Sequence, residues 1–288
     1  VMSVCSAKAL PKVVARLATL SERYGDNDKG VEQRVAASTC MLHSAVHLPT
    51  RLRGDACRDS VVAMLFVARC DANKRAAKAA ADAWTELAPT LRTRAAVAAT
   101  VDTIVRVCTS VNQLQRAQGY RAFALLCQRV ADDNVGGSSS SGSVLDTAPL
   151  VEVVTRALDR RAYWQGRETV FEACARLIIC LLATPSTIAT ANTLVALLAR
   201  QCAQRKRLDQ TRAALKAMMT VGDVVRTQHG GRVGDQLLLS LVIDDVAAAT
   251  SSVDEVSDDE AAVIAAEKAR GGSSSGGGGS SGGGGGSK

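Results

Sequence analysis

The sequence predicts an all-α protein built from stacked antiparallel helix pairs, and three observations lead to this fold class. Five prolines recur along the chain, about 40 residues apart in three of the four intervals: Pro11, Pro49, Pro89, Pro149 and Pro185. Apolar residues recur at helical spacing between them. Hydrophobic residues make up 47% of the chain and aromatic residues only 3%, so Ala, Val and Leu must fill the core. Small side chains allow helices to approach closely, which favours stacked helices over a β-sandwich.

A period of about 40 residues is the length of one HEAT or armadillo unit, which consists of two helices and a turn. Proline suits the first turn of a helix or the linker before it, so its placement agrees with this period. We therefore predict an α-solenoid of HEAT/armadillo-like antiparallel helix pairs, with about five to six repeats. First helices are expected over 8–24, 52–70, 91–110, 145–160, 187–203 and 233–250, and their partners over 30–47, 72–88, 114–132, 165–183 and 207–228.

The predicted second helices share a local pattern. An acidic or polar residue near the turn, suited to capping the helix, is followed by Arg or Lys and then by small residues. The pattern occurs in Val31–Ala37, Asp71–Ala80 and Leu208–Leu215. The tetratricopeptide alternative requires a period of about 34 residues and a Trp…Leu-Gly…Tyr signature. Because the chain lacks that signature, we favour the HEAT-like pattern.

Two tracts of nearly pure Gly and Ser divide the chain. Such composition behaves as flexible coil and cannot bury a core. We expect HEAT-like repeats on both sides of a flexible insert, then an acidic helix-like segment and a disordered tail. The expected bounds are 1–135 and 144–250 for the repeats, 136–143 for the insert, 251–270 for the acidic segment and 271–288 for the tail.

The net charge of +7 hides an uneven distribution, because residues 251–270 carry six acidic and only two basic side chains. The repeats are therefore more basic than the total implies, which permits nucleic-acid binding. Nucleic acid is nevertheless the less favoured partner, because few aromatic side chains are present to stack on bases. The basic turn Arg205, Lys206 and Arg207 is a candidate contact for an acidic partner. Ser257, which precedes three acidic residues, is a candidate phosphorylation site for an acid-directed kinase.

The sequence offers little for catalysis or for metal binding. We expect buried free thiols in a reducing compartment, because nine cysteines form no Cys-x-x-Cys pair and no disulfide framework. His43 and His47 lie four residues apart, but a zinc site requires three or four ligands and His229 is distant. No P-loop, dinucleotide-binding glycine pattern or G-x-S-x-G motif occurs. We therefore predict a protein without enzymatic activity, cofactor or metal.

No apolar run approaches the roughly 20 residues that span a bilayer. We accordingly expect a soluble protein of the cytoplasm, with the nucleus as a second compartment. The abrupt ends of the helical pattern lead us to expect that the chain is a piece of something longer.

The two tryptophans are candidates for repeat packing or for partner contact. Trp84 lies late in an Ala-rich helix, where packing between repeats is the expected role. Trp164 precedes an apolar helix, where it would fill the space at the helix start while Gly166 allows close approach. Arg167 and Glu168 complete this second set of candidate packing or contact residues.

Four stretches carry a family resemblance. They are Leu65–Ala68 with the following Trp84–Leu87, then Gln118–Ala122, Leu158–Ala175 and Leu197–Leu215. In this order they resemble the C-terminal region of the proteasome adapter and scaffold family, which consists of giant HEAT-repeat proteins. The third stretch is the most specific, because Arg161–Glu168 is similar to the family's Arg-x-Trp-x-Gly-Lys-Glu. Arg167 stands where the family has lysine, and the spacing before Trp164 is wider than in the family.

The resemblance covers about residues 8–228 and implies a function. It implies a non-enzymatic scaffold or adaptor fragment that binds proteasome core and regulatory subunits, bridges the two particles and modulates proteasome assembly or activity. Another giant HEAT adaptor, the ribosome-associated translational activator, is an alternative, because its repeats also pair an Arg-x-Asp turn (Arg69–Asp71 here) with a Trp-bearing helix. A basic nucleic-acid-binding solenoid is the third reading.

Overall fold

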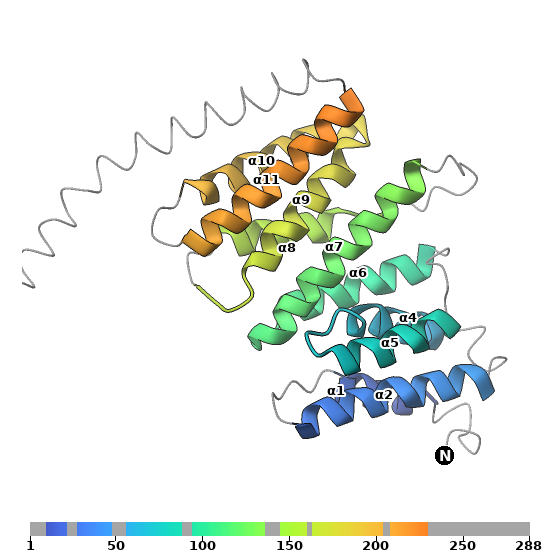
Figure 1. Cartoon of the computed structure of the whole chain (residues 1–288). Helices are drawn as coiled ribbons and strands as arrows, with labels where there is room; N and C mark the ends of the chain where they lie inside the picture. Colours follow the sequence, from blue (N-terminus) through green and yellow to red (C-terminus); the bar gives the residue numbers. More distant parts are fainter. Residues whose placement is uncertain are drawn as a thin grey trace, which may run out of the picture.

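A computed structural model describes residues 10–21, 28–47, 56–87, 94–135, 145–159, 163–203 and 208–229. These residues form α-helices and one 3-10 turn, and no strand occurs within them, so the predicted all-α class is confirmed (Figure 1). The helices are α1 (Leu10–Ser21), α2 (Asp28–His47), α4 (Ala56–Ala68), α5 (Lys74–Leu87), α6 (Arg94–Cys108), α7 (Gln113–Val135), α8 (Ala148–Asp159), α9 (Glu168–Leu182), α10 (Ile188–Cys202) and α11 (Leu208–His229), and the 3-10 turn is Pro185–Thr187.

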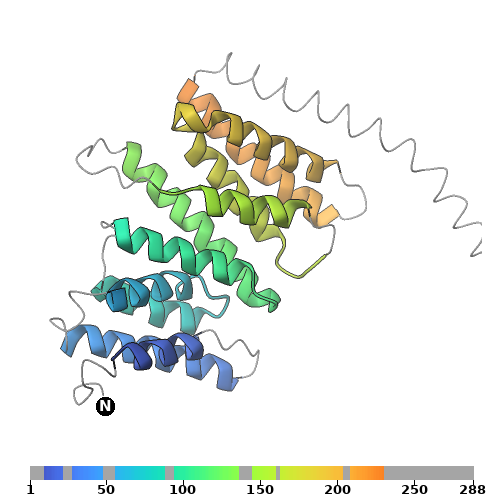
Figure 2. The ribbon, with the colours of Figure 1, turned by 180° about the vertical axis from the view of Figure 1, so that it is seen from behind.

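The helices are arranged in two layers. Helices α2, α5, α7 and α11 face the viewer in Figure 1, whereas α1, α6, α8 and α10 face the viewer when the molecule is turned in Figure 2. Consecutive helices pack as pairs, and each layer also stacks along the molecule, as α2 does on α5, α7 on α9 and α9 on α11. This arrangement is compatible with an α-solenoid. We call the layer of α2, α5, α7, α9 and α11 the second-helix layer. The layer of α1, α4, α6, α8 and α10 is the first-helix layer.

Ten of the eleven predicted helices correspond to the ten α-helices that the structure describes, with ends that differ by a few residues. Pro11 and Pro149 lie in the first turns of α1 and α8, and Pro185 opens the 3-10 turn, as expected for a residue whose missing N–H is harmless there. The predicted helix over 233–250, the Gly/Ser insert, the acidic segment and the tail lie outside the described residues.

Polar residues in the turns organise the second helices. Asn73 Oδ1 accepts hydrogen bonds from the backbone N–H groups of Arg75 and Ala76 at 3.0 and 3.3 Å. Asn112 Oδ1 caps α7 in the same way. The Asp71 carboxylate instead accepts a hydrogen bond from Arg34 Nε at 2.7 Å, between side chains only 3% and 7% exposed. This buried ion pair joins α2 to the turn between α4 and α5, and so links one helix pair to the next.

The stack is uneven in its middle. Helix α4 packs closely on α6, yet α5 and α7 barely touch. Both figures show α5 and α7 diverging toward their C-terminal ends. At the next helix pair along the stack, the second-helix layer is the more closely packed one. There α7 packs closely on α9, while α6 and α8 make less contact. The divergence leaves an angle between α5 and α7 that side chains must fill.

The core runs through the whole described stack, from Leu17 in α1 to Val225 in α11. Ala, Val and Leu make up most of it, and this allows very close approach at one point. A Cβ placed on Gly119 of α7 would lie 2.8 Å from the backbone nitrogen of Cys108 in α6. Only glycine therefore fits this helix crossing without displacement.

The cysteines are largely, but not uniformly, as expected. Seven cysteines have a described side chain and none of these forms a disulfide; Cys108, Cys127, Cys174 and Cys180 are buried. Burial raises the pKa of the Cys174 thiol to about 12. The expectation of burial is wrong for Cys40, which is exposed, because its position on α2 lies beside exposed Thr39 on the solvent side.

Candidate functional site

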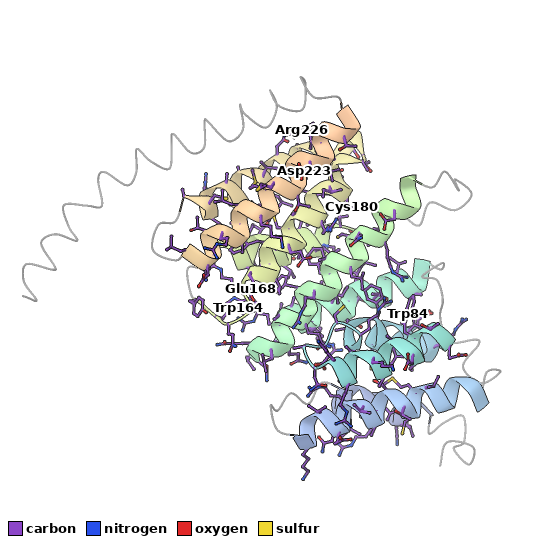
Figure 3. All side chains as sticks on the ribbon, viewed as in Figure 1. Trp84, Trp164, Glu168, Cys180, Asp223 and Arg226 are labelled. Atoms are coloured by element: carbon purple, nitrogen blue, oxygen red, sulfur yellow. The ribbon has the colours of Figure 1, made fainter. Side chains whose placement is uncertain are left out.

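The first cluster of functional interest surrounds Trp84. The indole lies near the end of α5, in the angle between α5 and α7, and is only 4% exposed (Figure 3). The guanidinium carbon of Arg69 lies 4.7 Å from its ring centroid, and that of Arg129 from α7 lies 4.6 Å from it. Phe66 meets the indole edge-on at 6.2 Å between centroids. Distances of this size give cation–π attraction, so these side chains fill the space that the diverging helices leave.

The charges of this Trp84 cluster are unbalanced. Within the described residues, no carboxylate pairs with Arg69 or Arg129. Burial lowers the pKa of Arg69, and repulsion from Arg129 lowers it further. Two buried donors of the cluster, Trp84 Nε1 and Arg69 Nη1, have no hydrogen-bond acceptor among the described residues. A buried donor without an acceptor lowers the stability of the fold. The cluster therefore carries positive charge that no described carboxylate balances, and two donors that can still form hydrogen bonds.

A second aromatic cluster surrounds Trp164, which lies just before α9 and is 7% exposed. Tyr120 of α7 packs against it at 6.2 Å between ring centroids, and the Arg116 guanidinium carbon lies 4.9 Å from the indole. Arg116 also donates to the backbone carbonyl oxygens of Ser110 and Val111, at 3.0 and 3.5 Å. Arg116 is therefore held over the Trp164 indole by acceptors of its own turn.

Gly166 fixes the chain around this second indole. Its φ of +93° is a conformation that L side chains rarely adopt, and a Cβ there would lie 2.7 Å from the Cβ of Ala117 in α7. The neighbouring Gln165 N–H donates to Gln113 Oε1 at 3.0 Å. The segment before α9 is thus bound against the first turns of α7.

Arg167 and Glu168, which we predicted as packing or contact residues together with Trp164, have different surroundings from the indole. Arg167 is 2% exposed, and its Nη2 donates to the Leu158 carbonyl oxygen and to Gln201 Oε1, both at 3.3 Å. It therefore ties the end of α8 to α10, which is a packing role. Glu168 is exposed in the first turn of α9 near Trp164 (Figure 3), where a negative charge suits the helix N-terminus.

The remaining candidate residues are not placed. Arg205, Lys206, Arg207 and Ser257 lie outside the described residues, as do the side chains of His43, His47 and His229. Sequence reasoning missed Arg69, Arg116 and Arg129, because each contacts its tryptophan from a different element or turn. A search for arginines one repeat before or after each tryptophan would have given Arg129 as one of many candidates.

The described part of the chain contains a small cavity and no metal-binding cluster. No group of three or more His, Cys, Asp and Glu side chains there could hold a metal ion. A cavity of about 10 Å³ between α4, α6 and α7, lined in part by Thr103, Gln115 and Gln118, has room for about one water molecule. None of the described helices has the length and hydropathy that crossing a membrane requires.

Comparison with known proteins finds no match of any kind: no family model, no curated protein and no solved structure. The function must therefore be inferred from the surface of the stack and from the two aromatic clusters.

Proposed function

We propose that this chain is a non-enzymatic scaffold that binds protein partners through its second-helix layer, and that proteasome core and regulatory particles are those partners. The supporting observation for binding is the series of exposed charged side chains along that layer. It includes Lys74, Lys78, Glu172, Arg212 and Lys216. Stacked helix pairs present such side chains on an extended surface, where many weak contacts add up to specificity. The choice of the proteasome rests on the sequence resemblance around Trp84 and Trp164.

The test is affinity purification of the tagged full-length chain from cells at moderate salt. Both core and regulatory subunits of the proteasome are expected in the recovered material. Recovery of neither would reject the proteasome as partner. Co-sedimentation with polysomes instead would favour the ribosome-associated alternative, and salt-sensitive retention on nucleic acid would favour the third.

A matched pair of variants tests which layer binds. Lys74→Glu with Lys78→Glu reverses two exposed charges on α5 in the second-helix layer. Arg106→Glu with Arg200→Glu reverses two exposed charges on α6 and α10 in the first-helix layer. The first variant is expected to lower recovery of the partner, and the second to leave it unchanged. The reverse pattern would move the binding surface to the first-helix layer.

A further inference from the structure

The Trp84 cluster combines three features that a purely structural aromatic contact does not need. Two guanidinium groups, of Arg69 and Arg129, lie within 5 Å of one indole centroid. Neither forms an ion pair with a carboxylate of the described residues. The indole itself is 4% exposed, and no acceptor for its Nε1–H occurs in the part of the chain that the structure describes. An uncompensated pair of positive charges beside a buried free donor is what an anion-binding site presents before its ligand arrives.

We propose that the Trp84 cluster binds a phosphate monoester group presented by a protein partner, with Arg69, Arg129 and the Trp84 indole N–H as donors. A phosphorylated side chain carries a charge of about −1.5 to −2 at neutral pH and offers three acceptor oxygens. That charge balances two guanidinium groups, whereas one carboxylate balances only one. Three oxygens also match a set of donors that includes two guanidinium forks and one indole N–H.

Access to the site depends on the two arginines, because their side chains fill the angle between α5 and α7. Arg69 and Arg129 are each only partly buried, so part of each side chain is exposed to solvent, although Arg69 Nη1 is buried. Arg121 adds further positive charge, since it lies close enough to Cys70 to act on that thiol together with Arg69. We expect an anion that approaches the angle between the two helices to meet the arginines first, and to reach the buried indole N–H once their side chains have moved.

The Trp164 cluster provides the internal comparison. Its arginine, Arg116, donates to carbonyl oxygens of Ser110 and Val111, and no second guanidinium lies over its indole among the described residues. The Trp164 cluster therefore offers less positive charge to a phosphate group, and we expect it to bind phosphate more weakly. This inference goes beyond the scaffold function and does not depend on which partner carries the phosphate, because it is tested on the isolated chain.

The experiment follows the indole N–H signals in ¹H–¹⁵N correlation spectra of the full chain. The chain has two tryptophans, and Trp164→Phe assigns the two signals. Inorganic phosphate is titrated at pH 7.5 and constant ionic strength, with acetate and chloride in parallel. The Trp84 signal is expected to move saturably with phosphate, on the order of millimolar half-saturation. The Trp164 signal is expected to stay in place, and acetate to act at least about tenfold more weakly.

Two variants identify the donors. Arg129→Gln is expected to weaken the phosphate response about tenfold or more. Arg200→Gln, which removes an exposed arginine of α10, is expected to leave it unchanged. The proposal is overturned if the Trp84 signal does not move, if phosphate and acetate act alike, or if Arg129→Gln responds as the wild type does.

A single-stranded oligonucleotide provides the last arm. Its concentration is counted in phosphate groups. If the oligonucleotide moves the Trp84 signal at a lower concentration than inorganic phosphate does, the site binds a nucleic-acid backbone and the protein phosphomonoester is rejected. The wild-type titration against acetate decides the question even if a variant fails to fold. Loss of proteasome recovery would leave this result unaffected, so the two proposals fail separately.

Discussion

The two tryptophan clusters use the same residue types for different ends. Around Trp164, one arginine is held by backbone carbonyl oxygens, a tyrosine covers the indole, and a left-handed glycine brings the chain against α7. Around Trp84, two arginines face one indole, and two buried donors lack acceptors within the described ranges. The first cluster lies where α7 and α9 pack closely, and the second where α5 and α7 diverge. A satisfied cluster therefore accompanies close packing, and an unsatisfied cluster accompanies the break in the stack.

The largest effect expected from this comparison is loss of the Trp164 side chain. Trp164→Ala removes a buried indole that contacts Tyr120 and Arg116, and should lower the free energy of unfolding by about 3–5 kcal/mol. Urea denaturation followed by circular dichroism measures this change. The adjacent Tyr163 is 56% exposed, so Tyr163→Ala is the matched control and should stay within about 0.5 kcal/mol of the wild type. Equal effects of the two changes would mean that Trp164 does not anchor the segment.

The next effect concerns the backbone that places this indole. Gly166→Ala forces an L side chain into a φ of +93° and brings its Cβ to 2.7 Å from that of Ala117. Backbone strain of about 1–2 kcal/mol and overpacking of about 1–3 kcal/mol should together destabilise the fold.

A double-mutant cycle with Ala117→Gly separates these two causes. In the Ala117→Gly background, the steric part of the cost should disappear and the strain should remain. An unchanged cost of Gly166→Ala in that background would show that the contact with Ala117 plays no part.

The sequence was sufficient for the helices but not for these clusters. Proline spacing and apolar stripes report on local geometry, and they placed ten helices close to their observed bounds. Trp84 and Trp164 were recognisable as packing candidates because large aromatic residues are rare in this chain. Their arginine partners come from other turns and other helices, and nothing local in the sequence states which arginine reaches which indole. Close packing at Gly119 and the ion pair of Arg34 with Asp71 are likewise consequences of how pairs stack.

Removal of a single arginine gives a smaller effect that differs in sign between the clusters. Arg116→Met leaves the carbonyl oxygens of Ser110 and Val111 without this donor, so it should cost about 1–2 kcal/mol of stability. Arg129→Met removes a charge that repels Arg69 and keeps an apolar stem over Trp84, so it should be neutral or slightly stabilising. Paired urea titrations measure both. A cost for Arg129→Met as large as that for Arg116→Met would contradict the view that the Trp84 cluster carries excess charge.

The smallest effect is a pH dependence confined to the Trp84 side of the comparison. Burial raises the pKa of the Cys70 thiol from 9.0 to about 11, although Arg69 and Arg121 oppose the rise. A folded-state pKa above the unfolded value means that the contribution to stability is complete below pH 9 and is lost as the pH rises toward 11. Between pH 8 and pH 10, Cys70→Ala should therefore lose about 1 kcal/mol less stability than the wild type.

The control for this difference is Met219→Ala, which alters an exposed apolar side chain on α11 and removes no titrating group. It should shift the free energy of unfolding equally at both pH values, because every thiol, including that of Cys70, and every lysine titrates as in the wild type. Urea titrations at pH 8 and pH 10, under reducing conditions, give the four differences required. If Cys70→Ala and Met219→Ala show the same dependence on pH, the Cys70 thiol titrates alike in folded and unfolded chains, and the arginines beside it offset its burial.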